Sequence, residues 1–107
     1  MADRHLLIKE LKALLRSHFG GVIQDVILFG SQAAGKAHED SDYDVLIVVS
    51  QDYDWRFRDR ISDLVYDLEL KYDILIDTFL ISTYELDHSL RGTQPVFRNA
   101  IQYGVYA

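Results

Sequence analysis

The sequence contains no cysteine, a single proline and no long apolar run. The absence of cysteine excludes disulfide bonds, thiolate metal sites and cysteine nucleophiles. No apolar stretch approaches the roughly 20 residues of a membrane-spanning helix, so we expect no membrane partner. The N-terminal segment lacks the apolar core of a secretory signal, because Glu10 and Lys12 interrupt its apolar stretch. We therefore expect a cytoplasmic protein.

Positive charge is also scarce, with 11 Lys and Arg residues against 17 Asp and Glu residues and a net charge of −6. Proteins that hold long DNA or RNA do so with basic surfaces, because affinity comes largely from phosphate contacts. Direct binding of a long nucleic acid is therefore disfavoured, whereas a small nucleotide remains compatible. Part of the negative charge can belong to a site for divalent cations.

With 107 residues, the chain is expected to form one domain over 1–107. Apolar residues at helical spacing predict helices, and short apolar runs predict strands. The predicted helices span residues 3–18, 31–37, 57–72, a short segment opened by a capping box at 82–85, and 95–103. The predicted strands span residues 22–29, 45–49 and 74–81.

The second and third predicted strands are joined by a long helix, so they should run parallel. The first and second are joined by a short link and should run antiparallel, since this brings Gly30 beside Asp42 and Asp44. The sequence therefore predicts an α+β fold, a small mixed β-sheet of about three strands with helices packed against it.

A Gly-Ser pair follows the first predicted strand. Gly30 allows close approach of the backbone to a phosphate, and Ser31 adds a hydroxyl group. Asp42 and Asp44 stand two residues apart at the entry to the second strand, so an extended backbone places both carboxylates on one face. Two such carboxylates are the usual protein contribution to a Mg²⁺ site that also binds phosphate oxygens. The pattern predicts nucleotide chemistry, although an Asp-rich turn is the alternative.

Asp77 is the third candidate carboxylate. Its neighbours are those of a buried strand, where an unpaired carboxylate is costly, and a metal shared with Asp42 and Asp44 would compensate for that cost. The alternatives are a carboxylate at a sheet edge and one paired with an arginine. Asp73 competes for the role, but it stands at the strand entrance and is explained more simply as a terminal residue.

Three segments make the chain similar to a known family. The sequences LFGSQAAG at 28–35 and DSDYDVL at 40–46 resemble the polymerase-β-like nucleotidyltransferase superfamily, and more narrowly the minimal nucleotidyltransferases (MNT) of prokaryotes. Residues 95–105 resemble the C-terminal segment of that group. The resemblance implies a polymerase-β-like fold, two Mg²⁺ ions and ATP as the substrate, with transfer of AMP and release of pyrophosphate.

The resemblance also implies roles for individual residues. Asp42 and Asp44 would hold both metal ions, while Asp77 would bind one of them and help to activate the attacking hydroxyl. Gly30 and Ser31 would hold the outgoing phosphates. The chain departs from many relatives in one respect, because Gln32 and Ala34 stand in a loop where those relatives carry arginines. Lys36 is close enough to replace the missing positive charge, and the alternative is a lysine that is only solvated.

A catalytic domain this small needs a partner that supplies the acceptor. MNT proteins are commonly paired with a HEPN-domain protein, a small helical ribonuclease toxin, so the resemblance implies an antitoxin that transfers AMP to a tyrosine of that toxin. One alternative is an antitoxin that masks a HEPN partner by forming a complex, without catalysis. Another is transfer of the nucleotide to a small-molecule hydroxyl.

Overall fold

The computed structural model of the protein describes residues 4–30 and 42–107. In chain order, the described elements are α1 (Arg4–Phe19), η1 (Gly20–Val22), β1 (Ile23–Phe29), β2 (Tyr43–Val49), α3 (Trp55–Tyr72), β3 (Ile76–Ser82), α4 (Thr83–His88), η2 (Arg91–Thr93), α5 (Pro95–Tyr103) and β4 (Val105–Tyr106). The helices and strands predicted within these ranges are confirmed to within a few residues at their ends. The helix predicted over 31–37 lies outside the described residues.

The sheet is mixed, with the strand order β3-β2-β1-β4. β1 and β2 run antiparallel, and β2 and β3 run parallel, as the sequence predicted. The prediction of about three strands missed β4, which pairs antiparallel with Ile27 and Leu28 of β1. Two residues are too few to show a strand periodicity, so only the pairing with β1 identifies this strand.

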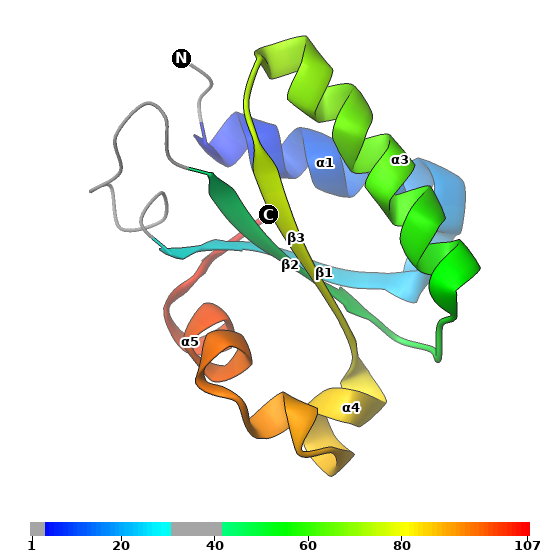
Figure 1. The fold of residues 1–107 in the computed structure, drawn as a ribbon, viewed down its shortest axis with the longest axis vertical. Helices are drawn as coiled ribbons and strands as arrows, with labels where there is room; N and C mark the ends of the chain where they lie inside the picture. The colour runs from blue at the N-terminus through cyan, green and yellow to red at the C-terminus, as the bar shows by residue number, and fades with distance from the viewer. Residues whose placement is uncertain (1–3, 31–41) are drawn as a thin grey trace.

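Helices cover both faces of the sheet, α1 and α3 on one and α4 and α5 on the other (Figure 1). Each face has its own cluster of buried apolar side chains. Every residue of β2 except Asp44 is buried. A strand covered on both faces is expected to be apolar throughout, and the run at 45–49 follows that rule.

Local sequence signals set the helix ends. The Asp54 side chain caps α3 by accepting a hydrogen bond from the backbone N–H of Phe57 (3.0 Å). Asp73 ends that helix in the left-handed conformation (φ 54°), which explains it as a terminal residue. The predicted capping box of α4 is present, with reciprocal bonds between Ser82 and Glu85. No helix in the described ranges is both long and apolar enough to cross a membrane.

Candidate functional site

Asp44 and Asp77 are direct register partners on the parallel strands β2 and β3. Paired residues in a sheet direct their side chains to the same face, so the two carboxylates lie side by side. This is the face on which Leu46 and Ile81 pack against α5. Tyr43, between the two aspartates of the motif, is buried in the cluster on the opposite face, as its alternation with Asp44 requires.

The surroundings of Asp44 disfavour its negative charge. Burial raises the pKa of the Asp44 carboxyl above its ordinary value, and the negative charges of Asp77 and Asp42 raise it further. On its other side Asp44 is the register partner of Phe29, whose ring packs edge-on against Phe79 with 5.3 Å between centroids. The charges of Asp42 and Asp77 thus act on Asp44, and a cation bound nearby would relieve this repulsion.

Gly30 directly follows β1 and lies against this site. Its φ of +74° is in the left-handed region, and a Cβ at this position would overlap Oδ2 of Asp44. Only glycine satisfies both conditions without strain. Sequence reasoning placed Gly30 beside Asp44 through an antiparallel arrangement of β1 and β2, and the structure confirms that placement.

The placement of Asp77 corrects one expectation. The third strand begins at Ile76 rather than Ile74, so Asp77 is its second residue, and its side chain is exposed. β3 also forms one edge of the sheet. Asp77 is therefore not the buried carboxylate in need of a compensating metal that the sequence had predicted, and the sheet-edge alternative describes its position. Asp77 remains a candidate metal ligand because it is the register partner of Asp44.

The carboxylates suit Mg²⁺ in chemistry, although they do not form a finished cage. Among residues 4–30 and 42–107, no three His, Asp or Glu side chains are arranged so that they could hold a metal ion. Mg²⁺ is usually held by one or two carboxylates, with water and substrate phosphates completing its shell. The adjacent carboxylates of Asp44 and Asp77 match this number of protein ligands. Ser31 and Lys36, the other predicted phosphate ligands, lie outside the described residues.

Phe29 and Phe79 are neighbours of the site that sequence reasoning did not single out. Phe79 follows Asp77 by two residues, so it shares the same face of β3. The alternation that placed Asp42 and Asp44 on one face would have identified it. The aromatic pair gives the site an apolar wall, consistent with the burial that raises the pKa of Asp44.

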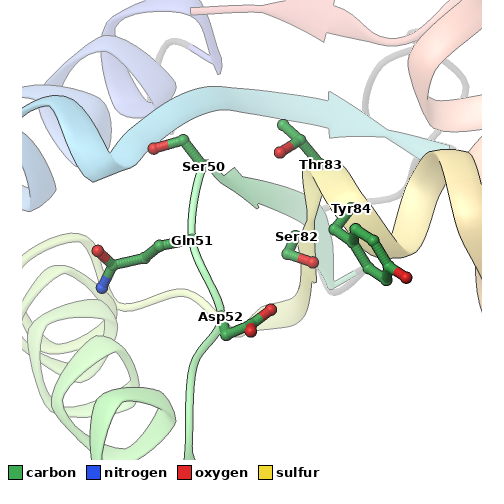
Figure 2. A pocket seen from close by; sticks show the side chains of 6 residues that line it. All are labelled: Ser50, Gln51, Asp52, Ser82, Thr83 and Tyr84. Carbon is green, nitrogen blue, oxygen red and sulfur yellow. The ribbon is translucent and has the colours of Figure 1, made fainter.

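A separate hollow of about 510 Å³ opens where β2 and β3 end (Figure 2). Its lining consists of Ser50, Gln51, Asp52, Ser82, Thr83 and Tyr84. Ser50 lies six residues after Asp44 along an extended strand, which places the two about 20 Å apart. The hollow is therefore not part of the carboxylate site.

Sequence comparison connects the chain to a known protein family. Residues 8–100 match the model of the nucleotidyltransferase domain family. Two proteins of Methanocaldococcus jannaschii, both provisionally named protein adenylyltransferases, are similar to the chain. One is 41% identical over 75 residues, which is 70% of each protein. The other is 38% identical over 74 residues, covering 69% of this chain and 75% of the relative.

Two crystal structures share the fold. One is a toxin–antitoxin structure with AMP-PNP, with a TM-score of 0.63 and 22% identity. The other is the toxin–antitoxin MntA-HpeT in a variant with two aspartate-to-glutamate substitutions, with a TM-score of 0.62 and 21% identity. Each match covers 92% of this chain and 69% of the other chain.

The family match extends over most of the chain and includes both the Gly-Ser turn and all three aspartates. The described part of the chain has the mixed sheet and helices expected from the sequence. The chain therefore belongs to the nucleotidyltransferase domain family and is a nucleotidyltransferase.

Proposed function

We propose that this chain transfers AMP from ATP to a hydroxyl of a partner protein, with Mg²⁺ held by Asp42, Asp44 and Asp77. The proposed acceptor is a tyrosine of a HEPN-domain ribonuclease toxin, which makes the chain the antitoxin of the pair. The observation that carries the proposal is the register pairing of Asp44 with Asp77, next to Gly30.

The relatives support the proposal from two directions. The two Methanocaldococcus jannaschii proteins are named for transfer of adenylyl groups to protein. The two similar crystal structures are toxin–antitoxin structures, one of them with an analogue of ATP. Together they favour a nucleotide donor and a toxin as the partner.

The positions of Asp77 and Asp44 suggest different roles for the two carboxylates in the transfer reaction. The transfer forms a bond between the acceptor oxygen and the α-phosphorus and breaks the bond from that phosphorus to the bridging oxygen, so pyrophosphate leaves. Asp77 is exposed at the start of an edge strand, where a carboxylate can meet a macromolecular acceptor and take the proton of its hydroxyl.

Asp44 is more enclosed and lies between the Gly30 turn and Asp77, so it belongs on the nucleotide side. Bound Mg²⁺ would supply Lewis-acid stabilisation of the charge on the phosphates. Ser31 and Lys36 are proposed to hold the outgoing phosphates.

An intact-mass measurement tests the proposal. The purified chain is mixed with a candidate HEPN-domain protein and Mg-ATP, and the mass of that protein is followed. We expect a gain that corresponds to one or more AMP groups, and no gain with Asp42→Asn/Asp44→Asn. The chain provides a matched control in Asp52→Asn/Asp54→Asn, which changes a second Asp-Tyr-Asp sequence in the turn before α3. Asparagine at position 54 still caps the helix, so this control should keep full activity.

A second candidate function is masking of the partner without catalysis. It is favoured by the absence, among the described residues, of a ready-made three-ligand metal site. An unmodified partner in a stable complex, neutralised equally by wild type and Asp42→Asn/Asp44→Asn, would establish this function instead. The absence of both modification and complex would overturn the HEPN assignment.

A further inference from the structure

Among residues 4–30 and 42–107, no strand pairs with the outer edge of β3. β3 contacts β2 on one side only, because it is the first strand in the order β3-β2-β1-β4. The N–H of Tyr43 donates to the carbonyl of Leu75 (2.9 Å), so the backbone groups of Leu75 point toward β2. Alternate residues from Leu75 onward therefore turn their backbone groups toward β2. The residues between them turn theirs outward: Ile76, Thr78, Leu80 and Ser82.

Side chains already form hydrogen bonds with the outward-facing backbone groups near both ends of β3. Glu69 accepts a hydrogen bond from the N–H of Ile76 (2.8 Å), and the Tyr53 hydroxyl donates to the carbonyl of Leu80 (3.1 Å). Between them, the N–H and C=O of Thr78 have no hydrogen-bond partner within residues 4–30 and 42–107. The free part of the edge is therefore short and centred on Thr78.

A cavity of about 150 Å³ lies against this part of the edge. Its lining includes Thr78, Phe79 and Leu80 of β3, Arg58 and Ser62 of α3, and Arg91 of η2. Unpaired backbone groups and two arginine side chains thus line the same cavity. This local positive charge contrasts with the net charge of −6 of the whole chain.

The two arginines are not equivalent. Arg91 forms an ion pair with Glu85 (3.2 Å) and stacks over Phe97. Arg58 lies over the ring of Tyr53, with its guanidinium 5.7 Å from the ring centroid, and has no ion-pair partner in the described part of the chain. Of the two arginines, Arg58 is therefore the one that is exposed and not already paired with a carboxylate of the described residues.

We propose that the outer edge of β3 binds an extended acidic segment of another protein as an added strand. The backbone of that segment pairs with Thr78, and one of its carboxylates binds Arg58. Where the segment is assigned to the acceptor protein, the inference rests on the proposed function. Asp77 directly precedes Thr78, so a strand added here carries its side chains past the proposed catalytic carboxylate.

Charge argues against a second copy of this chain as the occupant. A symmetric pairing of two β3 edges about Thr78 would bring Arg58 of each copy toward Arg58 of the other. Like charges across a strand pair are destabilising. An acidic segment from a different protein supplies the opposite charge at the same position.

Nuclear magnetic resonance on the isotope-labelled full chain tests the proposal. The probe is a capped octapeptide of alternating valine and glutamate, and the comparison peptide alternates valine and lysine. We expect the glutamate peptide to shift the Thr78 amide resonance and slow its hydrogen exchange, and the lysine peptide to leave both unchanged. Arg58→Glu should weaken binding by about tenfold, the scale of a lost charge-assisted contact.

Arg56→Glu is the matched control. It makes the same charge change two residues away on the same helix, where the guanidinium lies over Trp55 rather than in the cavity. We expect it to bind the glutamate peptide like the wild type. Ser62→Trp fills the cavity without altering charge and should also weaken binding.

Besides the absence of any Thr78 response, three results would overturn the proposed binding of a strand at the outer edge of β3. They are equal responses to both peptides, the same Thr78 response to free glutamate or inorganic phosphate alone, and Thr78 shifts that depend on protein concentration without peptide. The third would identify a second copy as the occupant. Adenylylation is measured separately, so an unmodified partner overturns only the proposed function. A Thr78 amide resonance that does not respond to the glutamate peptide overturns only the proposed binding at the edge of β3.

Discussion

Gly30 lies directly against the carboxylate of Asp44, and a side chain at position 30 would overlap its Oδ2 atom. The residue that directly follows β1 therefore forms one wall of the site at the start of β2. The close approach explains why glycine is needed at this turn, in addition to its left-handed backbone.

Gly30→Ala should reduce AMP transfer strongly and lower the free energy of unfolding by about 1–3 kcal/mol, the cost of a strained backbone. The reason is that alanine adds both left-handed strain and an overlap with Asp44. Gly20→Ala is a matched control, because Gly20 also has a positive φ (62°) but an added Cβ would meet nothing within 4 Å. Urea unfolding and the transfer assay should separate the two variants, with activity retained only in Gly20→Ala.

Asp44→Asn should raise the thermal unfolding temperature of the metal-free protein while abolishing AMP transfer. The substitution removes a partly buried charge that faces the charges of Asp77 and Asp42. Stability gained at the expense of activity is expected where function requires an unfavourable charge cluster.

Thermal unfolding with and without MgCl₂ measures this effect. Mg²⁺ should raise the unfolding temperature of the wild type and of Asp52→Asn, but not that of Asp44→Asn. An Asp44→Asn protein that is less stable than the wild type would contradict the prediction.

Tyr72→Phe should destabilise the fold at neutral pH and have little effect in acid. The Tyr72 hydroxyl donates to Glu10 (2.6 Å), and this bond, together with that from Lys71 (2.9 Å), lowers the pKa of the Glu10 carboxyl below its ordinary 4.5. A lowered carboxyl pKa stabilises the fold above the unfolded-state pKa, and the contribution is lost as the pH falls through the folded-state pKa. The difference between Tyr72→Phe and wild type should therefore shrink as the pH drops below 4.5.

Unfolding temperatures measured from pH 7 to pH 3 would follow this difference. Tyr66→Phe serves as the control, since it removes an exposed hydroxyl from the same helix that makes no hydrogen bond to the described residues. A constant difference for Tyr72→Phe across the pH range would show that Glu10 is not the cause.

Gly104→Ala should detach β4 from the sheet and cost about 1–3 kcal/mol of stability, the range for overpacking a filled position. Gly104 has an ordinary φ of −72°, so the effect is steric. An added Cβ would overlap the carbonyl oxygen of Ala100 and Cγ2 of Ile27. Gly21→Ala has open space around it and should be close to neutral, as urea unfolding of both variants would show.

The sequence alone predicted the elements whose side chains repeat. The stripe that includes Ile61, Val65 and Leu68 predicted α3, and all three residues are buried. The apolar run at 45–49 predicted a strand covered on both faces. Gly30 and the paired aspartates also predicted the antiparallel course of β1 and β2, because those residues could serve one site only if the strands ran that way.

Tertiary structure decided the features that depend on neighbours distant in sequence. β4 is too short for a periodic signal and exists through its pairing with Ile27 and Leu28. The exposure of Asp77 depends on β3 being an edge strand, and strand order leaves no trace in local apolar patterns. The free backbone of Thr78 has the same origin.

The spacing of residues along the chain thus determined which segments are helices and strands and which carboxylates can share a face. The reason is that spacing sets side-chain direction. The residue-to-residue pairing of Asp44 with Asp77 and the open edge beside Arg58 were decided only by the assembled sheet. These relationships join residues that are far apart in sequence, and their positions follow from how the strands pair and which one remains at the edge.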